Sequence, residues 1–222
     1  MEDLIKKEND IFEILNKFII SDFDFILVGG YAVSAFKHRF SVDADIVIQS
    51  ENLVNFENLL KEQDFKKVIT KQLENIYSSR FMRYEKEYVS IDLLIDALAS
   101  RTTNASFSYD LISINSIKKK IIGIEKEVTV RIPTKELLIV MKIHSGRLTD
   151  FRDIAALAKG SNLNLIKKYL FIGDLKKIED NLSRLNIVVN DKNFVNSFKG
   201  VFIEKKFDID FEQVKKISQL RK

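Results

Sequence analysis

The spacing of apolar and polar positions predicts that short strands alternate with helices in the first part of the chain. Apolar residues recur at helical spacing over residues 3–20, and the apolar run from Phe23 to Val28 predicts a buried strand. Gly29 and Gly30 follow this run and predict a tight turn. The same two periods predict helices at 31–37 and 51–62 and strands at 43–48 and 65–69.

A hairpin and then a series of helices are expected further along the chain. Alternation on both sides of the sequence EKE at 85–87, within residues 75–95, predicts two paired strands. Residues 111–131 show no clear period, although 125–132 look extended. From Thr134, a typical residue to cap a helix, the period is helical. The helices expected there lie at 134–147, 150–159, 163–170, 174–185, 191–199 and 209–220.

This order predicts an α+β fold in which a mixed β-sheet flanked by helices is followed by an all-helical domain. The boundary is expected near residue 132, which gives an α/β domain of residues 1–132 and a helical domain of residues 133–222. A chain of 222 residues is long enough for either one large domain or two small ones with a sizeable core.

Composition excludes several classes of protein and site. Apolar residues make up 45% and charged residues 31%, as in an ordinary globular protein, and no apolar run reaches the roughly 20 residues of a membrane span. The absence of cysteine excludes disulfides, a thiolate nucleophile and cysteine metal sites. The N-terminus has no signal-peptide core, so we expect a cytoplasmic protein without a membrane partner. The GxxxxGK[ST] phosphate loop is missing, which argues against a P-loop enzyme.

Positive charge gathers in the last third of the chain. The net charge is +4, and residues 159–222 hold twelve Lys and two Arg against eight acidic residues, a net of +6. Such a segment is able to meet a phosphate backbone. The plainer interpretation is a solvated face of lysine-rich helices.

Three aspartates on predicted strands point to a cation site. Asp43 and Asp45 are two residues apart on one strand, so they share a face about 6.6 Å apart. Asp92 stands in the middle of an apolar strand, and Asp96, at the end of that strand, is the weaker candidate. Like charges on one face repel, and burying them without partners is costly, so a cation is expected between Asp43 and Asp45. Carboxylate oxygens are the ligands that Mg²⁺ prefers.

The Gly29-Gly30 turn before these aspartates is a candidate phosphate site. Glycine lets a phosphate approach the backbone, and the helix start that follows offers free N–H groups. Each motif alone is usually structural, but their spacing together favours phosphoryl or nucleotidyl transfer with two metal ions.

These motifs resemble the signature of the DNA-polymerase-β-like nucleotidyltransferase superfamily. The string GGYAVSAFKHRFSVDADI is similar to that of its AbiEii-like branch, whose toxins belong to abortive-infection and toxin–antitoxin systems. A second block, ELLIVMKIHSGRLTDFRDIAAL, resembles the lysine-helix block of the same branch and contains Lys142, Arg147, Asp150 and Asp153. The resemblance covers roughly residues 25–158, and residues past 160 match no family.

The resemblance implies a nucleotidyltransferase-type sheet and two Mg²⁺ ions held by Asp43, Asp45 and Asp92. It implies transfer of a nucleoside monophosphate from a nucleoside triphosphate (NTP) to an acceptor, with Lys142 as a fourth catalytic residue. The residues expected to contact the NTP are Gly29, Gly30, Arg39, Lys142 and Asp153. One departure is Gly30, where many members of the superfamily have serine.

The surroundings of Lys142 leave its partner open. It is a lone cation in an apolar helix and needs a partner, which is either a triphosphate or one of Asp150 and Asp153. If one helix continued from 142 to 153, Lys142 and Asp153 would share a face, although Ser145 and Gly146 stand between them as breakers.

Other charged residues near the two motifs are candidates for contact with a carboxylate or a phosphate. His38 is expected to close its loop against a carboxylate or carbonyl, and Arg39 is a candidate to contact phosphate. Arg80 and Arg83 lie on opposite faces of a strand, so one of them can reach the site.

The leading hypothesis is therefore an Mg²⁺-dependent nucleotidyltransferase. The basic C-terminal third favours RNA, such as the end of a tRNA, as the acceptor, and the resemblance alone implies a toxin with an antitoxin partner. The alternatives are AMP transfer to a protein hydroxyl and a non-catalytic nucleotide-binding module of the same fold.

Overall fold

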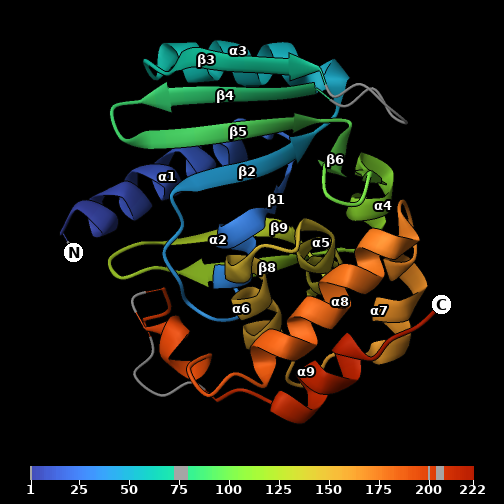
Figure 1. The fold of residues 1–222 in the computed structure, drawn as a ribbon. Coiled ribbons are helices and arrows are strands. Elements are labelled where there is room, and N and C mark those ends of the chain that lie inside the picture. The colour runs from blue at the N-terminus through green and yellow to red at the C-terminus, as the bar shows by residue number, and fades with distance from the viewer. Residues whose placement is uncertain (1, 73–79, 200, 204–207) are drawn as a thin grey trace. The chain divides into compact units, whose positions relative to one another are not determined.

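The chain forms two compact units. The first contains Met1–Ala99 and Phe107–Pro133, and the second contains Ser100–Ser106 and Thr134–Lys222. The computed structural model describes residues 2–72, 80–199, 201–203 and 208–222 (Figure 1). The first residues of the expected hairpin, 75–79, lie outside this range.

A five-stranded mixed sheet with the order β1-β2-β5-β4-β3 forms the centre of the first unit. β2 and β5 run parallel, and the other neighbours are antiparallel. The strands are β1 (Ile26–Val28), β2 (Asp43–Ile48), β3 (Lys66–Gln72), β4 (Arg80–Lys86) and β5 (Val89–Ile95). The predicted α+β class is confirmed.

Two helices, α1 (Glu2–Ile20) and α3 (Leu53–Glu62), cover one face of this sheet (Figure 1). Phe18 of α1 and Phe56 of α3 are both fully buried, with ring centroids 4.9 Å apart. Ala44 and Ile91, which are register partners on β2 and β5, face the same core. Because successive strand residues point to opposite faces, the aspartates of these strands lie on the other side of the sheet.

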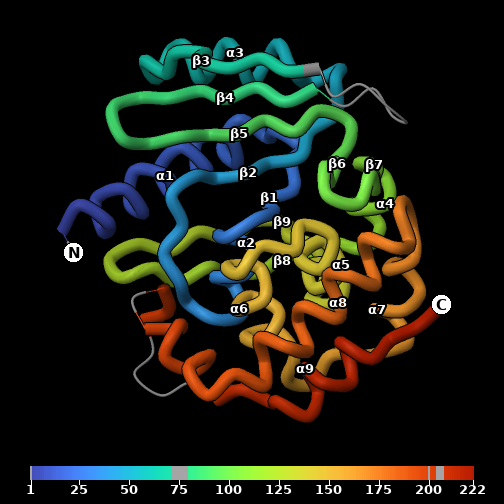
Figure 2. The backbone as a smooth tube through the Cα atoms, viewed as in Figure 1, coloured from blue at the N-terminus to red at the C-terminus, as the bar shows by residue number. Residues whose placement is uncertain are grey.

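The chain leaves β1 through the short helix α2 (Gly29–Ser34) and returns along residues 35–42 to β2, which pairs with β1 (Figure 2). The helix predicted at 31–37 is therefore shorter and begins at the glycines.

The spacing of apolar residues did not predict most of the other elements of the first unit. Within the region that showed no clear period lie part of α4, the hairpin strand β8 and part of its partner β9. Three consecutive lysines, 118–120, hide the alternation of β8. The bounds of these and the other short elements are η1 (Ser50–Asn52), β6 (Ala97–Ser100), β7 (Ala105–Ser108), α4 (Tyr109–Ile114), β8 (Ser116–Ile122) and β9 (Glu127–Pro133).

Helices make up most of the second unit. They are α5 (Lys135–Ser145), α6 (Leu148–Leu157), α7 (Leu163–Leu170), α8 (Leu175–Val189), η2 (Val195–Phe198) and α9 (Phe211–Ser218). α6, α7 and α8 all pack against α5, whose residues 137–144 are buried. The helix predicted at 191–199 is reduced to the single turn of η2. Among the described residues, no helix has the length and apolar character needed to span a membrane.

Candidate active site

The turn after β1 brings the Asp45 carboxylate against a glycine. Gly29 has a φ of +66°, and a Cβ built on it would lie 2.0 Å from Oδ2 of Asp45. The pairing of β1 with β2, in which Val28 is opposite Asp45, sets this approach. Glycine is required here both for the left-handed backbone and for the space that the carboxylate fills.

Replacing Gly29 with alanine should therefore both destabilise the protein and displace Asp45. A left-handed backbone costs an alanine about 1–2 kcal/mol, and the contact with Asp45 adds to that. The matched control is Gly160→Ala, because Gly160 has a φ of +67° but only the Nζ of Lys135 near its Cβ, at 4.0 Å. Urea unfolding should show a larger loss of stability for Gly29→Ala than for Gly160→Ala. Equal losses of unfolding free energy in the two variants would mean that the close approach of Asp45 to Gly29 does not add to the cost of the substitution.

The loop of residues 35–42 folds back over Gly30. A Cβ on Gly30 would lie 2.3 Å from Oγ of Ser41 and 3.2 Å from Nη2 of Arg39. The Ser34 hydroxyl holds this loop, because it accepts from the backbone N–H of Arg39 at 3.2 Å and donates to its carbonyl at 3.1 Å. The guanidinium of Arg39 is thus beside the glycine turn.

A buried carboxylate anchors the same loop. Nε2 of His38 lies 3.0 Å from Oε1 of Glu8, and the backbone N–H of Ile124 donates to Oε2 of Glu8 at 2.9 Å. The expectation that His38 closes its loop against a carboxylate is confirmed. Glu8 was not among the residues predicted from the sequence, although it stands on the face of α1 that buries Ile11 and Leu15.

The parallel pairing of β2 and β5 brings the three predicted aspartates to one face of the sheet. Asp45 is the register partner of Asp92, and Asp43 is opposite Ser90. Asp92 is only 2% exposed, whereas Asp43 and Asp45 are partly exposed. Asp96, the weaker candidate, instead accepts a hydrogen bond from the backbone N–H of Ser50 at 2.7 Å, which is a structural role.

The sequence predicts a cation between Asp43 and Asp45, but the pair that the structure joins through a cation is Asp43 and Asp92. That cation is Arg83, on β4. Its Nε and Nη2 donate to the two oxygens of Asp92 at 2.7 and 2.6 Å, and the same Nη2 donates to Oδ2 of Asp43 at 2.8 Å. The sequence left open whether Arg80 or Arg83 reaches the site. The antiparallel pairing that sets Arg83 opposite Asp92 gives the answer. The charge of Arg80 instead acts on Glu57, at the α3 side of the sheet.

Burial and charge oppose each other at Asp92. Burial raises the pKa of its carboxyl, and the hydrogen bonds and charge of Arg83 act in the other direction. Hydrogen bonding to Asp92 in turn raises the pKa of Arg83, which stays charged. The buried Asp92 and the partly exposed Asp43 therefore share one compensating cation, Arg83.

The donors of this face suit Mg²⁺. Asp43 and Asp92 converge on one cation position, and Asp45 lies on the same face of the sheet. Hard carboxylate oxygens from two neighbouring strands are the donor set that Mg²⁺ takes. Within the part of the chain that the structure describes, no three acidic or histidine side chains are already arranged around an ion position, and Arg83 fills the place between two of them.

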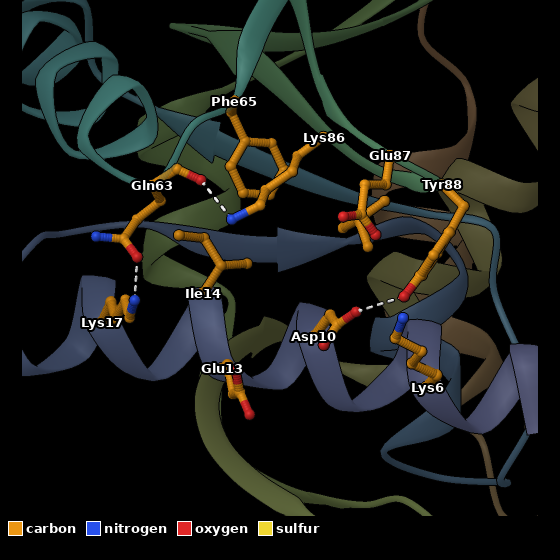
Figure 3. A pocket seen from close by; sticks show the side chains of 11 residues that line it. Lys6, Asp10, Glu13, Ile14, Lys17, Gln63, Phe65, Lys86, Glu87 and Tyr88 are labelled. Carbon is orange, nitrogen blue, oxygen red and sulfur yellow. Dashed lines mark hydrogen bonds between the residues drawn. The ribbon is translucent and has the colours of Figure 1, made fainter.

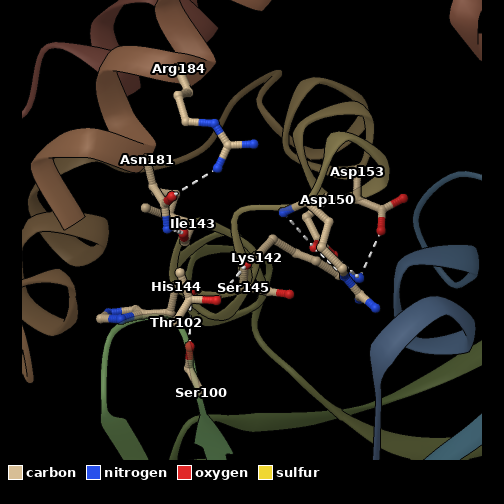
Figure 4. A network of polar contacts seen from close by, with 11 residues as sticks. Ser100, Thr102, Lys142, Ile143, His144, Ser145, Asp150, Asp153, Asn181 and Arg184 are labelled. Atoms are coloured by element: carbon tan, nitrogen blue, oxygen red, sulfur yellow. Dashed lines mark hydrogen bonds and ion pairs between the residues drawn. The ribbon is translucent and has the colours of Figure 1, made fainter. Parts of the chain in front are cut away.

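In the second unit, Lys142 pairs with both aspartates that the sequence offered as its alternatives to a triphosphate (Figure 4). Its Nζ lies 3.1 Å from Oδ1 of Asp150 and 2.7 Å from Oδ2 of Asp153. Both carboxylates are fully buried, and Lys142 is 7% exposed. The proposed catalytic lysine is therefore part of a buried ion network in this structure.

Arg147 completes this network at the start of α6. Its backbone N–H and its Nε donate to Oδ2 of Asp150 at 3.1 and 2.8 Å. Burial opposes the ionisation of Asp150, but Arg147 and Lys142 together lower its pKa below the usual value.

The two separate helices predicted here, with a break at Ser145 and Gly146, are confirmed. α5 ends at Gly146, which has a φ of +67° and caps the helix in the left-handed conformation. Lys142 and Asp153 meet across the corner between α5 and α6, and the contact arises from the packing of two helices. A Cβ on Gly146 would lie 2.5 Å from the side-chain amide of Asn181, so this corner also requires glycine.

His144 is buried in a hydrogen-bonded position next to this network. Its Nε2 lies 2.9 Å from the carbonyl oxygen of Leu170, and its Nδ1 lies 2.7 Å from Oγ1 of Thr103. Since a carbonyl only accepts, Nε2 carries the proton and Nδ1 accepts from the Thr103 hydroxyl. Burial lowers the pKa of His144 from 6.5 to about 4, against the opposing effect of the Leu170 bond.

This depressed pKa predicts acid sensitivity. The unfolded chain takes up a proton on His144 below pH 6.5, and the folded protein does so only near pH 4. Its contribution is therefore fully present above pH 6.5 and is lost as the pH falls toward 4, by about 3 kcal/mol in all. Urea unfolding of the wild type and His144→Gln between pH 7 and 4 checks this, because the variant should lose less stability. Parallel curves would contradict a neutral buried His144.

A separate pocket of about 270 Å³ lies between α1 and the β4–β5 turn (Figure 3). Its polar groups pair with one another: Lys86 donates to the Gln63 carbonyl at 2.9 Å and Tyr88 to Asp10 at 3.2 Å. No predicted site residue lines it, so it does not alter the assignment of the site.

Comparison with known proteins gives structural neighbours only. No family model matches the sequence, and no curated protein matches it. The solution structure of the antibiotic-resistance factor ANT(2'')-Ia has a TM-score of 0.53 at 13% identity, over 72% of this chain and 86% of that chain. The crystal structure of ANT(2'')-Ia in complex with adenylyl-2''-tobramycin has a TM-score of 0.51 at 13% identity, over 79% of this chain and 97% of that chain.

At this identity the likeness concerns the fold. It agrees with the mixed sheet, the flanking helices and the helical C-terminal region. The AbiEii-like branch is not tested by these matches. The chain therefore shares its fold, a nucleotidyltransferase-type mixed sheet flanked by helices, with these structures.

Proposed function

We propose that this protein is an Mg²⁺-dependent nucleotidyltransferase that moves a nucleoside monophosphate from an NTP to an acceptor. The observation that carries the proposal is the convergence of Asp43 and Asp92 on one cation position, with Asp45 on the same face beside Gly29. Within a nucleotidyltransferase fold, this convergence supports a metal site next to a phosphate site.

Each residue has a defined task in this proposal. Asp43, Asp45 and Asp92 would hold the metal ions, and Arg39, beside the Gly29-Gly30 turn, would bind the triphosphate. When bound, Mg²⁺ neutralises phosphate charge and favours the deprotonated form of the attacking hydroxyl. The acceptor oxygen bonds to the α-phosphorus and loses its proton. The bond from that phosphorus to the bridging oxygen breaks, and pyrophosphate leaves with the electron pair.

Lys142 and Asp153 are retained as candidates for contact with the triphosphate, as the resemblance implies. Their mutual ion pair favours a structural role in the protein without NTP. A catalytic contact would require Lys142 to exchange one carboxylate for a phosphate.

RNA, such as the end of a tRNA, is the acceptor we favour. Residues 159–222 carry a net charge of +6, which complements a phosphate backbone. A small-molecule acceptor competes with this choice, because the solved neighbour was crystallised with adenylyl-2''-tobramycin. A toxin role with an antitoxin partner, and a cytoplasmic location, remain predictions.

A label-transfer assay tests the function and the acceptor class together. The protein is incubated with Mg²⁺, each α-³²P NTP in turn, and total RNA or cell protein, with the Asp43→Asn/Asp45→Asn double variant alongside. Label that RNase removes and the variant fails to transfer supports RNA. Label that only protease removes supports AMP transfer to a protein. Triphosphate binding without transfer in any arm would favour a non-catalytic module.

A further inference from the structure

One guanidinium nitrogen joins two of the three candidate metal ligands. Nη2 of Arg83 lies 2.8 Å from Oδ2 of Asp43 and 2.6 Å from Oδ2 of Asp92. The three side chains come from three adjacent strands, β2, β5 and β4, and the sheet register fixes where each one projects. The contact is thus determined by the sheet and does not depend on a loop.

The pair of aspartates needs this cation. The Asp92 side chain is 3% exposed and that of Asp43 is 31% exposed, so water compensates the first carboxylate poorly. Without Arg83, the two carboxylates would repel each other across neighbouring strands. The bidentate contact with Asp92 also fixes the orientation of that carboxylate.

The same position is the one that a divalent cation would take. An Mg²⁺ ion binds carboxylate oxygens at about 2.0–2.1 Å. An ion held by both carboxylates would have to enter the space beside them that Nη2 of Arg83 now occupies. Both cations cannot occupy this space at once. The Arg83 side chain is 27% exposed, so its guanidinium has solvent into which it can move.

We propose that Arg83 is a built-in counter-cation that keeps Asp43 and Asp92 converged in the metal-free protein and that a divalent cation must displace to bind. Arg83 is then a positioning residue with two opposite effects. It stabilises the metal-free protein, and it lowers the apparent affinity for the metal because its own ion pairs are lost when the metal enters. The inference rests on the metal site of the proposed function.

The test compares Mn²⁺ binding, followed by the EPR signal of free Mn²⁺, in the wild type, Arg83→Gln and Arg83→Lys. Arg80→Gln is the matched control, because Arg80 lies on the same strand but on the other face. Arg83→Gln should bind Mn²⁺ at least tenfold more tightly than the wild type. Its metal-free form should melt at a lower temperature, and Mn²⁺ should raise that temperature by more. Arg80→Gln should match the wild type, and adding Asp43→Asn to Arg83→Gln should remove the gain.

If Arg83→Gln does not fold, Arg83→Lys is the variant that tests the inference. Lysine retains the charge but cannot form the bidentate fork, so Mn²⁺ affinity should rise by a smaller factor of about two to five. Unchanged or weaker Mn²⁺ binding in both Arg83 variants would overturn the inference and leave Arg83 as a plain structural ion pair.

The transfer assay separates this result from the proposed function. Transfer by the wild type together with unchanged Mn²⁺ affinity in the Arg83 variants overturns only the counter-cation role. Tighter Mn²⁺ binding without any transfer supports that role and overturns only the enzymatic proposal.

Discussion

Replacing Asp45 with asparagine should lower the rate of label transfer at least ~10³-fold while the fold remains intact, a difference of about 4 kcal/mol in activation free energy. Asparagine has the size of aspartate but lacks the charge that draws a divalent cation to this face. Asp45 is the best of the three aspartates for this test, because Asp43 and Asp92 also hold Arg83 and their replacement disturbs that ion pair. Initial rates at saturating NTP and Mg²⁺, together with far-UV circular dichroism, measure activity and fold separately.

The control for this variant is Asp96→Asn. Asp96 is close in sequence to Asp92, but its carboxylate accepts from the Ser50 N–H. Its φ is +64°, a conformation that asparagine tolerates well. Transfer should stay within about threefold of the wild type. If Asp96→Asn lost as much transfer activity as Asp45→Asn, Asp96, which directly follows β5, would have to be counted among the carboxylates of the site.

The sequence allowed prediction of the elements whose pattern is local. β2 has the predicted bounds, 43–48, because its apolar residues and its two aspartates follow one strand period. The glycine turn before it was also predicted, since a positive φ such as that of Gly29 is a property of one residue. Contacts that depend on strand register or on helix packing were harder to predict from the sequence.

Arg83 and Lys142 illustrate the two reasons. Whether Arg80 or Arg83 reaches Asp92 depends on the pairing of β4 with β5, which a shift of one residue would reverse. The partners of Lys142 depend on the corner at Gly146, where α5 ends and α6 begins with a new direction. A helical period predicts which face a residue occupies, but it does not predict which neighbouring helix that face meets.

Replacing Lys142 with methionine should destabilise the protein by about 3–5 kcal/mol, the usual cost of removing one partner from a buried ion pair. Methionine keeps the length of the side chain but removes the ammonium that lies 2.7 Å from the fully buried Asp153. Asp150 should be affected less, because Arg147 also donates to it. The free energy of unfolding from urea titration measures the loss.

Two further variants decide what Lys142 does. Lys135→Met on the same helix is the matched control and should cost less than about 1 kcal/mol, because Lys135 donates to the Lys159 carbonyl on the surface. Adding Asp153→Asn to Lys142→Met should recover part of the stability, since the amide leaves no unpaired charge in the interior. No loss in Lys142→Met would contradict the buried network. A double variant that regains stability and also transfers label would assign Lys142 and Asp153 to the fold alone. A stable but inactive double variant would indicate that Lys142 or Asp153 contacts the triphosphate.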